Sequence, residues 1–481
     1  MDPRSVDYAQ ARAGLFARGH GRMVPDLDRI TRLVELLADP QLAYPTVHVT
    51  GTNGKSSTTR MVAALLSELG LTAGTFTSPH LQTVRERFQV GLQPVSEGDF
   101  ARAWAAVETV AELVDEEAGE AGDTVTFFEL TTAMALWLFA DLPVDIGVIE
   151  VGMGGRWDAT NVVASDIAVI TPIDVDHREL GDDAVAAARE KAGIIKSGSH
   201  VVLGAQSDEV LAVLLDAAAA VDAPVLQWRR DVEVVDRAIA VGGQVVALRV
   251  GVRTIADVFV PVHGVHQVDN AALALAAVAS LLGPRFDEVD DEVVRAGFAR
   301  VTTPGRLEVV AHEPTIVLDG AHNPHGARAA ALAIDEAFAF RNVVLVIAAL
   351  ADKDLHGIVG AWRDVVDHVV VTRPDSPRAA PVERLAAVAE EVFAGTAAAV
   401  ERADDVAHAL ELATGLTGDG DGVVVTGSLY TVGAARDLYA SPAPASPPAL
   451  APPSSPSASG AQPPPHVPWD PEPDSAPPWP E

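Results

Sequence analysis

The stretch TVHVTGTNGKSSTTRMVAALL, Thr46–Leu66, decides the architecture of this chain. A β-rich run, Thr46–Thr50, leads through two glycines into Lys-Ser-Ser, and an apolar pattern of helical period then continues to Gly70. A strand that enters a helix through such a loop is typical of a phosphate site, because the N–H groups and the dipole at the helix start attract anions. The loop departs from the usual pattern G-x-x-x-x-G-K-S/T, since Val49 stands where the first glycine belongs.

The loop residues predict roles in binding a nucleotide. We expect the backbone N–H groups of Thr52–Ser56 to point at phosphate oxygens, Lys55 to neutralise charge on the β- and γ-phosphates, and the Ser56 hydroxyl to bind Mg²⁺. The alternative is a glycine-rich turn capped by serine. Strand, loop, Lys-Ser pair and helix together favour the nucleotide site.

Composition limits the class of protein. The chain has 481 residues, of which 48% are hydrophobic and 21% charged, so it is long enough for more than one globular domain. Its 34 Lys and Arg against 67 Asp and Glu give a formal charge of −33, which would repel nucleic acid. The absence of cysteine excludes disulfides and thiolate metal sites. No signal-like N-terminus and no run of 18 apolar residues is seen, so we expect a cytoplasmic protein without a membrane span.

Apolar runs of strand length alternate with helical patterns, which predicts an α/β fold. The first part, residues 1–301, is expected to be a doubly wound, mostly parallel sheet of the phosphate-loop type. Its strands are expected at Thr46–Thr50, Asp145–Gly152, Ile167–Thr171 and His200–Ala205. The segment VEVVDRAIAVGGQVVALRV, with Gly-Gly at its turn, is interpreted as a hairpin appended to that sheet.

The alternation restarts after residue 301 and predicts a smaller, Rossmann-like α/β domain over residues 302–440, with a hinge at Thr302–Pro304. Residues 441–481 are rich in Pro, Ser and Ala and are expected to be a disordered tail.

Polar residues follow several predicted strands, where ligands of open α/β sheets bind. Glu150 ends one strand and is a candidate metal ligand, although such a carboxylate is often only solvated. Asp174, Asp176 and His177 follow the next strand, and a lone histidine there can also be structural. Lys191, in REKAGIIK, is either a surface charge, a partner of Glu190, or a buried lysine that takes up CO₂ to become a carbamate ligand of magnesium.

Several further motifs occur in a fixed order along the chain: TSPHLQTVRERFQVGLQPVS, TFFELTTAMALWLFA, VIEVGMGGRWDATNVV, REKAGIIK, GVHQVDNAALALAAV, PGRLEVV, LDGAHNPHGA, ALADKD and VTGSLYTVGAAR. Together with HVTGTNGKSS they resemble the folylpolyglutamate synthase/dihydrofolate synthase family of Mur-type ligases over roughly residues 25–440. The loop of that superfamily resembles GTNGKS/T. Cell-wall precursor ligases have a separate substrate domain ahead of the loop, for which the residues before Thr46 leave little room.

The resemblance implies functions for particular residues. Residues implied to hold MgATP are Thr52, Asn53, Gly54, Lys55, Ser56, Ser57, Asn270 and Arg306. Those implied to surround magnesium are Ser56, Glu150, His177 and a carbamylated Lys191. Asp319, His322, Ser428 and Tyr430 are implied to close over ATP and receive glutamate, with Asp319 also a nucleotide contact. Ser78, Pro79 and His80 of SPHL, with Phe127 and Phe128, are implied to form the pterin-side pocket.

The resemblance implies ATP-dependent addition of L-glutamate to dihydropteroate and to reduced folates through an acyl phosphate. We expect a monomeric chain that is bifunctional in this sense. Its partners would be small molecules. Two alternatives remain: a ligase of the same fold that joins another acid and amino acid, and a nucleotide-hydrolysing switch that makes no amide. ATP turnover that depends on glutamate and a pterin acid would exclude the switch.

Overall fold

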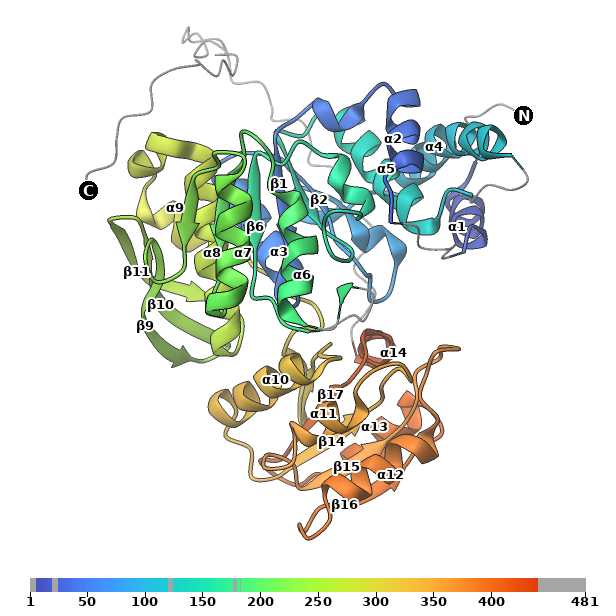
Figure 1. Ribbon diagram of the computed structural model, residues 1–481. Coiled ribbons are helices and arrows are strands. Elements are labelled where there is room, and N and C mark those ends of the chain that lie inside the picture. Colours follow the sequence, from blue (N-terminus) through green and yellow to red (C-terminus); the bar gives the residue numbers. More distant parts are fainter. Residues whose placement is uncertain (1–5, 20–24, 120–123, 176–179, 182, 440–481) are drawn as a thin grey trace, which may run out of the picture. The chain divides into compact units, whose positions relative to one another are not determined.

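The computed structural model describes residues 6–19, 25–119, 124–175, 180–181 and 183–439. These residues form three β-sheets with flanking helices (Figure 1). The predictions made for Asp176, for His177 and for residues 441–481 lie outside the described residues.

The first sheet has eight strands in the order β4-β3-β2-β5-β1-β6-β7-β8. Their bounds are β1 Thr46–Thr50, β2 Ala73–Phe76, β3 Phe88–Val90, β4 Gln93–Pro94, β5 Ile146–Glu150, β6 Ile167–Ile170, β7 His200–Leu203 and β8 Val225–Gln227. All pairings from β2 to β8 are parallel, and β3 and β4 add an antiparallel edge. The predicted doubly wound, mostly parallel sheet is therefore confirmed.

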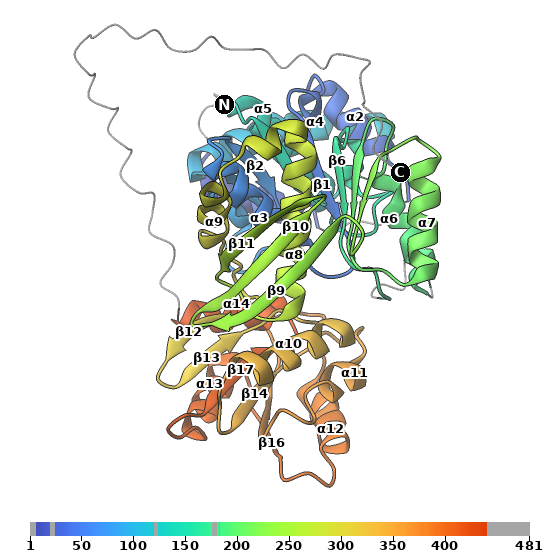
Figure 2. The ribbon, with the colours of Figure 1, turned by 90° about the vertical axis from the view of Figure 1, so that its left-hand side faces the viewer.

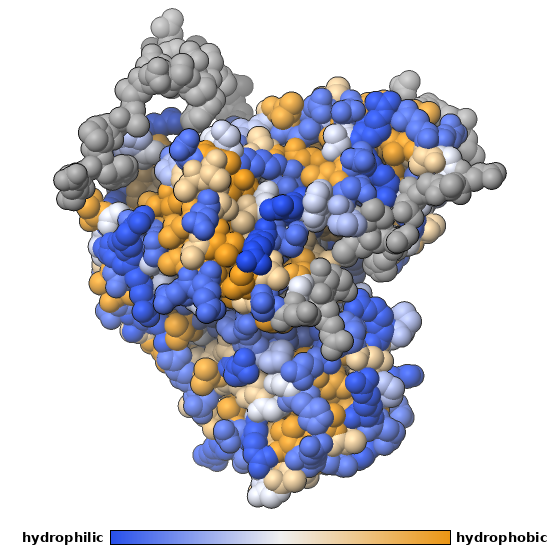
Figure 3. All heavy atoms as spheres, in the orientation of Figure 1, coloured by the Kyte–Doolittle hydropathy of each residue, from blue (hydrophilic) through white to orange (hydrophobic). Residues whose placement is uncertain are grey.

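Helices cover both faces of this sheet (Figure 1). They are α1 Tyr8–Ala17, α2 Asp28–Leu36, α3 Lys55–Glu68, α4 Glu97–Ala118, α5 Phe127–Asp141, α6 Ala184–Lys191, α7 Asp208–Ala219, α8 Val265–Leu282 and α9 Asp291–Ala299. Strand side chains alternate between the faces, as the two-residue period requires. Val47 and Val49 pack with α3 and α8, whereas Ala168 and Ile170 of β6 pack with α6 and α7. On the face shown in Figure 3, apolar side chains also gather over α7, between polar side chains.

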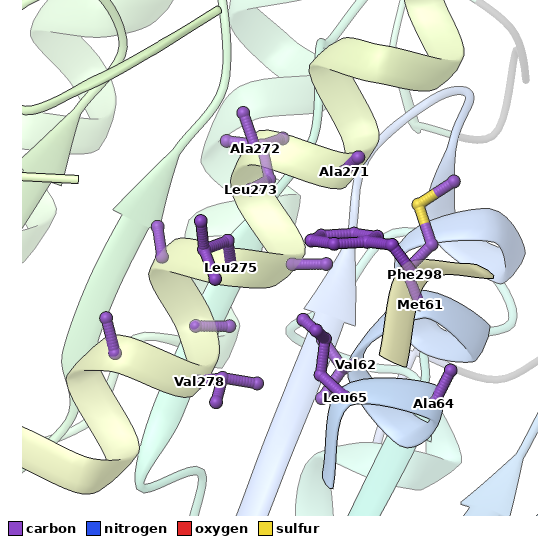
Figure 4. Close-up of a cluster of buried hydrophobic side chains, with 14 of the residues drawn as sticks. Met61, Val62, Ala64, Leu65, Ala271, Ala272, Leu273, Leu275, Val278 and Phe298 are labelled. Carbon is purple, nitrogen blue, oxygen red and sulfur yellow. The ribbon is translucent and has the colours of Figure 1, made fainter. Parts of the chain in front are cut away.

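Helix α3 is fixed between the sheet, α8 and α9. It starts at Gly54 in a left-handed conformation, and Gly70, at φ +77°, follows its end. Figure 4 shows Met61, Leu65 and Phe298 in the buried cluster beneath it. A Cβ on Gly297 of α9 would lie 3.0 Å from Leu65, so α9 and α3 are in close contact. This packing gives the phosphate-loop helix a rigid base.

The segment interpreted as an appended hairpin forms a separate sheet, in the order β11-β10-β9 (Figure 2). Its antiparallel strands are β9 Val232–Ala240, β10 Gly243–Val250 and β11 Arg253–Val260. The prediction of a hairpin was right, but its attachment to the first sheet was wrong and β11 was missed. The physical reason is that alternate side chains, such as Val246 and Leu248, are buried against α8, which leaves the strand edges unpaired with β8.

Helix α8 lies in the one helical stretch of the described residues that combines great length with an apolar composition. Val265–Glu288 is long and apolar enough by composition to cross a membrane, but 67% of its most apolar window is buried. Ala271, Ala274 and Val278 lie in the core with the first sheet. Its hydropathy therefore fits a core helix.

The third sheet has six strands in the order β12-β13-β17-β14-β15-β16, and only β12 is antiparallel. Its strands are β12 Glu308–His312, β13 Thr315–Leu318, β14 Val343–Ile347, β15 His368–Val371, β16 Ala399–Arg402 and β17 Gly422–Thr426. Its helices are α10 Pro324–Ala337, α11 Leu355–Gly360, α12 Val382–Val392, α13 Val406–Gly415 and α14 Leu429–Tyr439. The first three helices pack on one face and the last two on the other, which confirms a second α/β unit.

Candidate active site

The loop between β1 and α3 has a shape that requires glycine. Gly51 has φ +147° and Gly54 has φ +87°. A Cβ would lie 1.7 Å from Thr171 Oγ1 at Gly51, and 2.4 Å from Asn270 Oδ1 at Gly54. The Thr171 hydroxyl donates to the Asn53 carbonyl over 2.6 Å. Only glycine combines these backbone angles with such close approach.

Thr52 is bound to the segment that follows β6. Its N–H donates to the Pro172 carbonyl at 3.0 Å, and its hydroxyl lies 2.8 Å from the Asp174 carbonyl and 3.0 Å from the Asp174 N–H. The expectation that the Thr52 N–H points at a phosphate was therefore wrong, because this donor already has a backbone acceptor. Thr52 instead anchors the loop to the neighbouring strand end.

Two lysines meet at the start of the loop. Lys55 Nζ donates to the carbonyls of Gly51 and Thr52 at 3.0 and 3.1 Å, and Lys191 Nζ donates to the same Gly51 carbonyl at 2.7 Å. Lys191 is only 3% exposed, so the alternative of a solvent-facing surface lysine was wrong. A Cβ on Gly193 would lie 2.5 Å from Arg156, so the turn after α6 packs closely against the segment that follows β5.

Ser56 and Glu150 are also brought together. The Ser56 hydroxyl donates to Glu150 Oε1 at 2.7 Å, and the Ser78 N–H donates to Oε2 at 3.0 Å. Glu150 is buried, because β5 ends beside β1 with Glu150 opposite Val49. Burial raises the pKa of Glu150, while Lys55 and the two hydrogen bonds oppose that rise. The alternative of a merely solvated carboxylate was therefore wrong.

Asn270 lies against the loop from α8. Its side chain is buried, donates to Gln267 Oε1 at 3.3 Å, and occupies the space beside Gly54. The structure therefore brings Asn270 to the phosphate loop, and its role as a nucleotide contact stays a prediction.

Asp319 and Arg306 lie at the carboxyl end of β13. Asp319 accepts N–H groups from Leu307 at 3.1 Å and Ala321 at 2.9 Å, so it ties two backbone segments together. Burial raises the pKa of Asp319, and the Arg306 charge opposes that rise. A Cβ on Gly320 would lie 2.4 Å from Arg306 Nη1, so Gly320 leaves room for the guanidinium group.

The N-terminus of α10 contacts the tip of the phosphate loop. Asn323 Nδ2 donates to Asn53 Oδ1 at 3.0 Å, and Asn53 Nδ2 lies 3.0 Å from His325 Nδ1. His322, two residues after Gly320, has Nδ1 2.9 Å from the Gly320 carbonyl. The LDGAHNP motif is therefore in direct contact with the loop, through an asparagine that the sequence analysis did not single out.

Ser428 and Tyr430 belong to the turn from β17 into α14. Ser428 is buried and accepts the Tyr430 N–H at 3.2 Å, whereas Tyr430 is 51% exposed. A Cβ on Gly433 of α14 would lie 2.4 Å from the Leu81 carbonyl, so SPHL packs against this helix. Ser57 is buried in the first turns of α3, behind Ser56.

The two phenylalanines expected to form one pocket face different neighbours. Phe127 lies 5.5 Å from the Phe16 ring, and the Arg87 guanidinium lies 5.2 Å from the Phe127 centroid. Phe128 lies 6.0 Å from Phe76 instead, because adjacent helical residues project about 100° apart. The structure therefore groups Phe127, but not Phe128, with the SPHL segment.

His80 joins the Phe127 group through Arg87. Arg87 Nε donates to His80 Nδ1 at 3.0 Å, and the His80 ring lies 6.3 Å from Phe16. Burial and then the Arg87 charge lower the pKa of His80 to about 3, so this imidazole is neutral near pH 7.

One cavity joins the two strand-end regions. Its lining residues come from α3, the SPHL segment, the linker after residue 301 and α14; they are Ser56, Ser57, Arg60, Thr77, Pro79, Leu81, Glu86, Thr303, Pro304, Arg306 and Leu429. The sequence analysis missed Arg60, Glu86 and Arg87. Glu86 and Arg87 stand within a quoted motif, but Arg60 follows SSTT on a helix and gave no local signal.

These features define a ligase of the Mur class. Residues 49–278 match the model of the Mur ligase middle domain, and residues 305–429 match that of the Mur ligase, glutamate ligase domain. The chain is 44% identical over 443 residues to the dihydrofolate synthase/folylpolyglutamate synthase of Mycobacterium tuberculosis, covering 87% of this chain and 91% of that protein. It belongs to the dihydrofolate synthase/folylpolyglutamate synthase family.

Other similar proteins have the same family name. The protein of the same name from Bacillus subtilis is 32% identical over 427 residues, covering 88% of this chain and 97% of that protein. Mycobacterium tuberculosis folylpolyglutamate synthase complexed with ADP aligns with a TM-score of 0.85 at 42% identity, over 90% of this chain and 98% of that one. E. coli FolC in complex with DHPP and ADP aligns with a TM-score of 0.77 at 29% identity, over 90% and 98%.

Proposed function

We propose that this chain is an ATP-dependent ligase that joins L-glutamate to dihydropteroate and to reduced folates. The observation that carries the proposal is that the phosphate-loop helix, the SPHL segment and the start of α14 line one and the same cavity. It brings the expected sites of ATP, acid and amino acid within reach of one another. The names of the relatives, and the ADP and DHPP in their structures, support the same assignment.

The reaction proposed for this cavity has two steps. A carboxylate oxygen of the acid attacks the γ-phosphorus of ATP, the bond to ADP breaks, and an acyl phosphate forms. The glutamate amine then attacks the acyl carbon and loses a proton, the C–O bond between the acyl carbon and the phosphate oxygen breaks, and inorganic phosphate leaves with that oxygen. Lys55 stabilises the phosphoryl charge, and His322 and Asp319 act on the side where the amine arrives. A closed cavity is required because water would otherwise hydrolyse the acyl phosphate.

We assign the nucleotide to Asn53, Gly54, Lys55, Ser56 and Ser57 with Asn270 and Arg306. The pairing of Asn53 with Asn323 supports this assignment, since a nucleotide at the loop would lie beside α10. We place the division between domains at residues 301 and 302, with the hinge at Thr302–Pro304, because Thr303 and Pro304 line the cavity.

The residues present fit magnesium. Ser56 Oγ and Glu150 Oε1 are oxygen donors 2.7 Å apart, and Mg²⁺ is commonly held by one or two protein oxygens with phosphates and water. No cluster of three His, Asp or Glu side chains occurs in the described part of the chain. When bound, magnesium would neutralise phosphate charge.

Carbamylation of Lys191 remains part of the proposal. The buried Nζ at Gly51 supports it, since a carbamate would place an anionic oxygen at the loop. Loss of activity in Lys191→Ala with partial rescue by formate or acetate would support the carbamate. A ¹³C-labelled CO₂ adduct should be visible by NMR in the wild-type protein and absent from that variant. Full activity in the variant would contradict it.

The test of the function is mass spectrometry of products from ATP, glutamate and either dihydropteroate or tetrahydrofolate. We expect one added glutamate from each acid, with equimolar ADP and phosphate. Product from another acid and amino acid alone would favour the alternative ligase, and phosphate release without an amide would favour the switch. We propose a monomer that acts on small molecules in the cytoplasm, without nucleic acid or membrane partners, in keeping with its charge of −33.

A further inference from the structure

Arg60 on α3 faces the cavity without a counter-ion bonded to it. It follows Ser56 by one helical turn, so both side chains lie on the same face of α3. Both residues line the cavity, together with Arg306 from the linker. Among the described residues, no acceptor lies within hydrogen-bond or ion-pair distance of either guanidinium group.

The two carboxylates nearest to Arg60 already have other donors. Glu86 accepts the N–H groups of Leu81, Gln82 and Thr83 at 2.8, 3.0 and 2.8 Å. Glu150 accepts from Ser56 and from the Ser78 N–H. Their negative charges therefore partly offset the positive charge of Arg60 from a distance, but neither forms an ion pair with it.

The electrostatic surroundings of Arg60 are unfavourable. Burial lowers the pKa of Arg60, Glu86 and Glu150 raise it, and the Arg306 and Arg436 charges lower it further. Arg436 is itself bonded to Glu308 at 3.1 Å, whereas Arg306 is not bonded to a carboxylate. Two guanidinium groups that share a cavity without a bonded anion destabilise the protein, and an anion between them would reverse that effect.

We propose that Arg60 binds the reacting carboxylate of the acid substrate and the acyl phosphate made from it, in the cavity that Arg306 also lines. This assignment rests on the proposed function. The cavity places Arg60 between the phosphate-loop serines and Thr77, Pro79 and Leu81 of the acid-side segment. A guanidinium group matches a carboxylate in a two-pronged geometry, and it reduces the repulsion between that carboxylate and the triphosphate.

The assignment distinguishes Arg60 from a nucleotide contact. A nucleotide contact would bind phosphate whether or not an acid is present. A residue that binds the carboxylate changes the affinity only of ligands that have this carboxylate. The test therefore varies the ligand and the residue together, with dihydropteroate and its neutral primary carboxamide as probes in the presence of MgADP.

We expect the wild-type chain to bind dihydropteroate more tightly than the carboxamide. In Arg60→Gln that preference should fall by about tenfold or more, the value of a charged hydrogen bond, while the Kd for MgADP stays within about twofold. Arg60→Lys keeps the charge but not the planar fork, so it should keep only part of the preference. Arg300→Gln is the matched control, because Arg300 pairs with Glu68 at the other end of α3.

The outcomes separate the assignment from the proposed function. An unchanged preference in both Arg60 variants, or an equal loss of MgADP affinity, would overturn the assignment while the wild-type chain still makes the amide. A rise confined to the KM for glutamate would overturn it as well, in favour of the amino-acid side. If the wild-type chain forms no amide and binds no dihydropteroate, the proposed function fails, and the assignment of Arg60 fails with it.

Discussion

The carboxyl end of the eight-stranded sheet and that of the six-stranded sheet are shaped by different forces. At the first, glycines with positive φ and very close neighbours determine where the loop lies, as with Gly51 against Thr171. At the second, the buried carboxylate of Asp319 holds the backbone N–H groups of Leu307 and Ala321, and the Arg306 charge acts on that carboxylate. The first region should therefore be most sensitive to added volume, and the second to changes in charge.

The largest effect is expected where the first region does use a charge. Lys55→Ala removes the Nζ that donates hydrogen bonds to the Gly51 and Thr52 carbonyls. We expect the rate of ligation to fall by roughly 10³-fold, because stabilisation of the phosphoryl charge is lost. Thermal melting should change little. The measurement is ADP release beside a melting curve, with Arg402→Ala, an exposed ion-pair residue, as control. Turnover like that of the wild-type chain would remove the loop from the mechanism.

A steric change tests the shape of the loop. In Gly51→Ala the new Cβ would lie 1.7 Å from Thr171 Oγ1 at a φ of +147°, so we expect a loss of about 3 kcal/mol or more in unfolding free energy and weak ADP binding. Gly70→Ala is the matched control. Its φ is also positive, at +77°, but nothing lies within 4 Å, so it should cost only about 1–2 kcal/mol and leave ADP binding unchanged. Equal costs in denaturant titrations would mean that backbone angle alone matters.

The second region should respond differently to the same kind of substitution. Gly320 has no positive φ, but its new Cβ would lie 2.4 Å from Arg306 Nη1 and from Leu429 Cδ2, which are the ends of flexible side chains. Gly320→Ala should therefore displace Arg306 and lower kcat/KM by about tenfold or more, with little change in melting temperature. Gly415→Ala, with nothing within 4 Å, is the control. A large drop in stability without a kinetic effect would contradict the charge-based description of this region.

The sequence predicted the segment from β1 to α3 better than the placement of β9–β11 and β4, for physical reasons. Strand β1, the loop and α3 are specified by residues that are consecutive in the chain, so their pattern is local. The attachment of β9–β11 depends on which apolar face covers α8, and no local pattern contains that information. Strand β4 is only two residues long and was missed, because such a segment has no measurable period.

The site residues were likewise predictable only where a local sequence pattern marks them. Glu150 and Lys191 follow recognisable strand and helix patterns, and both lie at the loop. Phe127 and Phe128 are adjacent in sequence but diverge on α5, because the helical rotation separates them. Arg60 looked like an ordinary polar helix residue, and only the cavity reveals that its guanidinium group faces the region where the substrates would meet.

A buried hydrogen-bond network includes His48 of β1. His48 on β1 is fully buried, with Nε2 2.8 Å from Thr160 Oγ1, and Thr160 donates to Asp158 at 2.5 Å. Burial and then the Lys196 charge lower the pKa of His48 to about 3. The unfolded chain, in which histidine titrates near pH 6.5, therefore binds more protons than the folded chain between about pH 3 and pH 6.5. The contribution of His48 to stability therefore rises with pH across that window and falls as the solution is acidified.

The smallest predicted effect is a change in that slope. His48→Gln keeps a hydrogen-bonding group near Thr160 but cannot gain a proton, so the slope of unfolding free energy between pH 4.5 and 6 should become shallower by about 1.4 kcal/mol per pH unit. His356→Gln, which removes a histidine side chain that is 58% exposed in the C-terminal α/β unit, is the control. Denaturant titrations at several pH values measure both slopes. Identical slopes in the wild-type chain and His48→Gln would show that His48 is already protonated when folded, and the first region would then depend on buried charge as the second does.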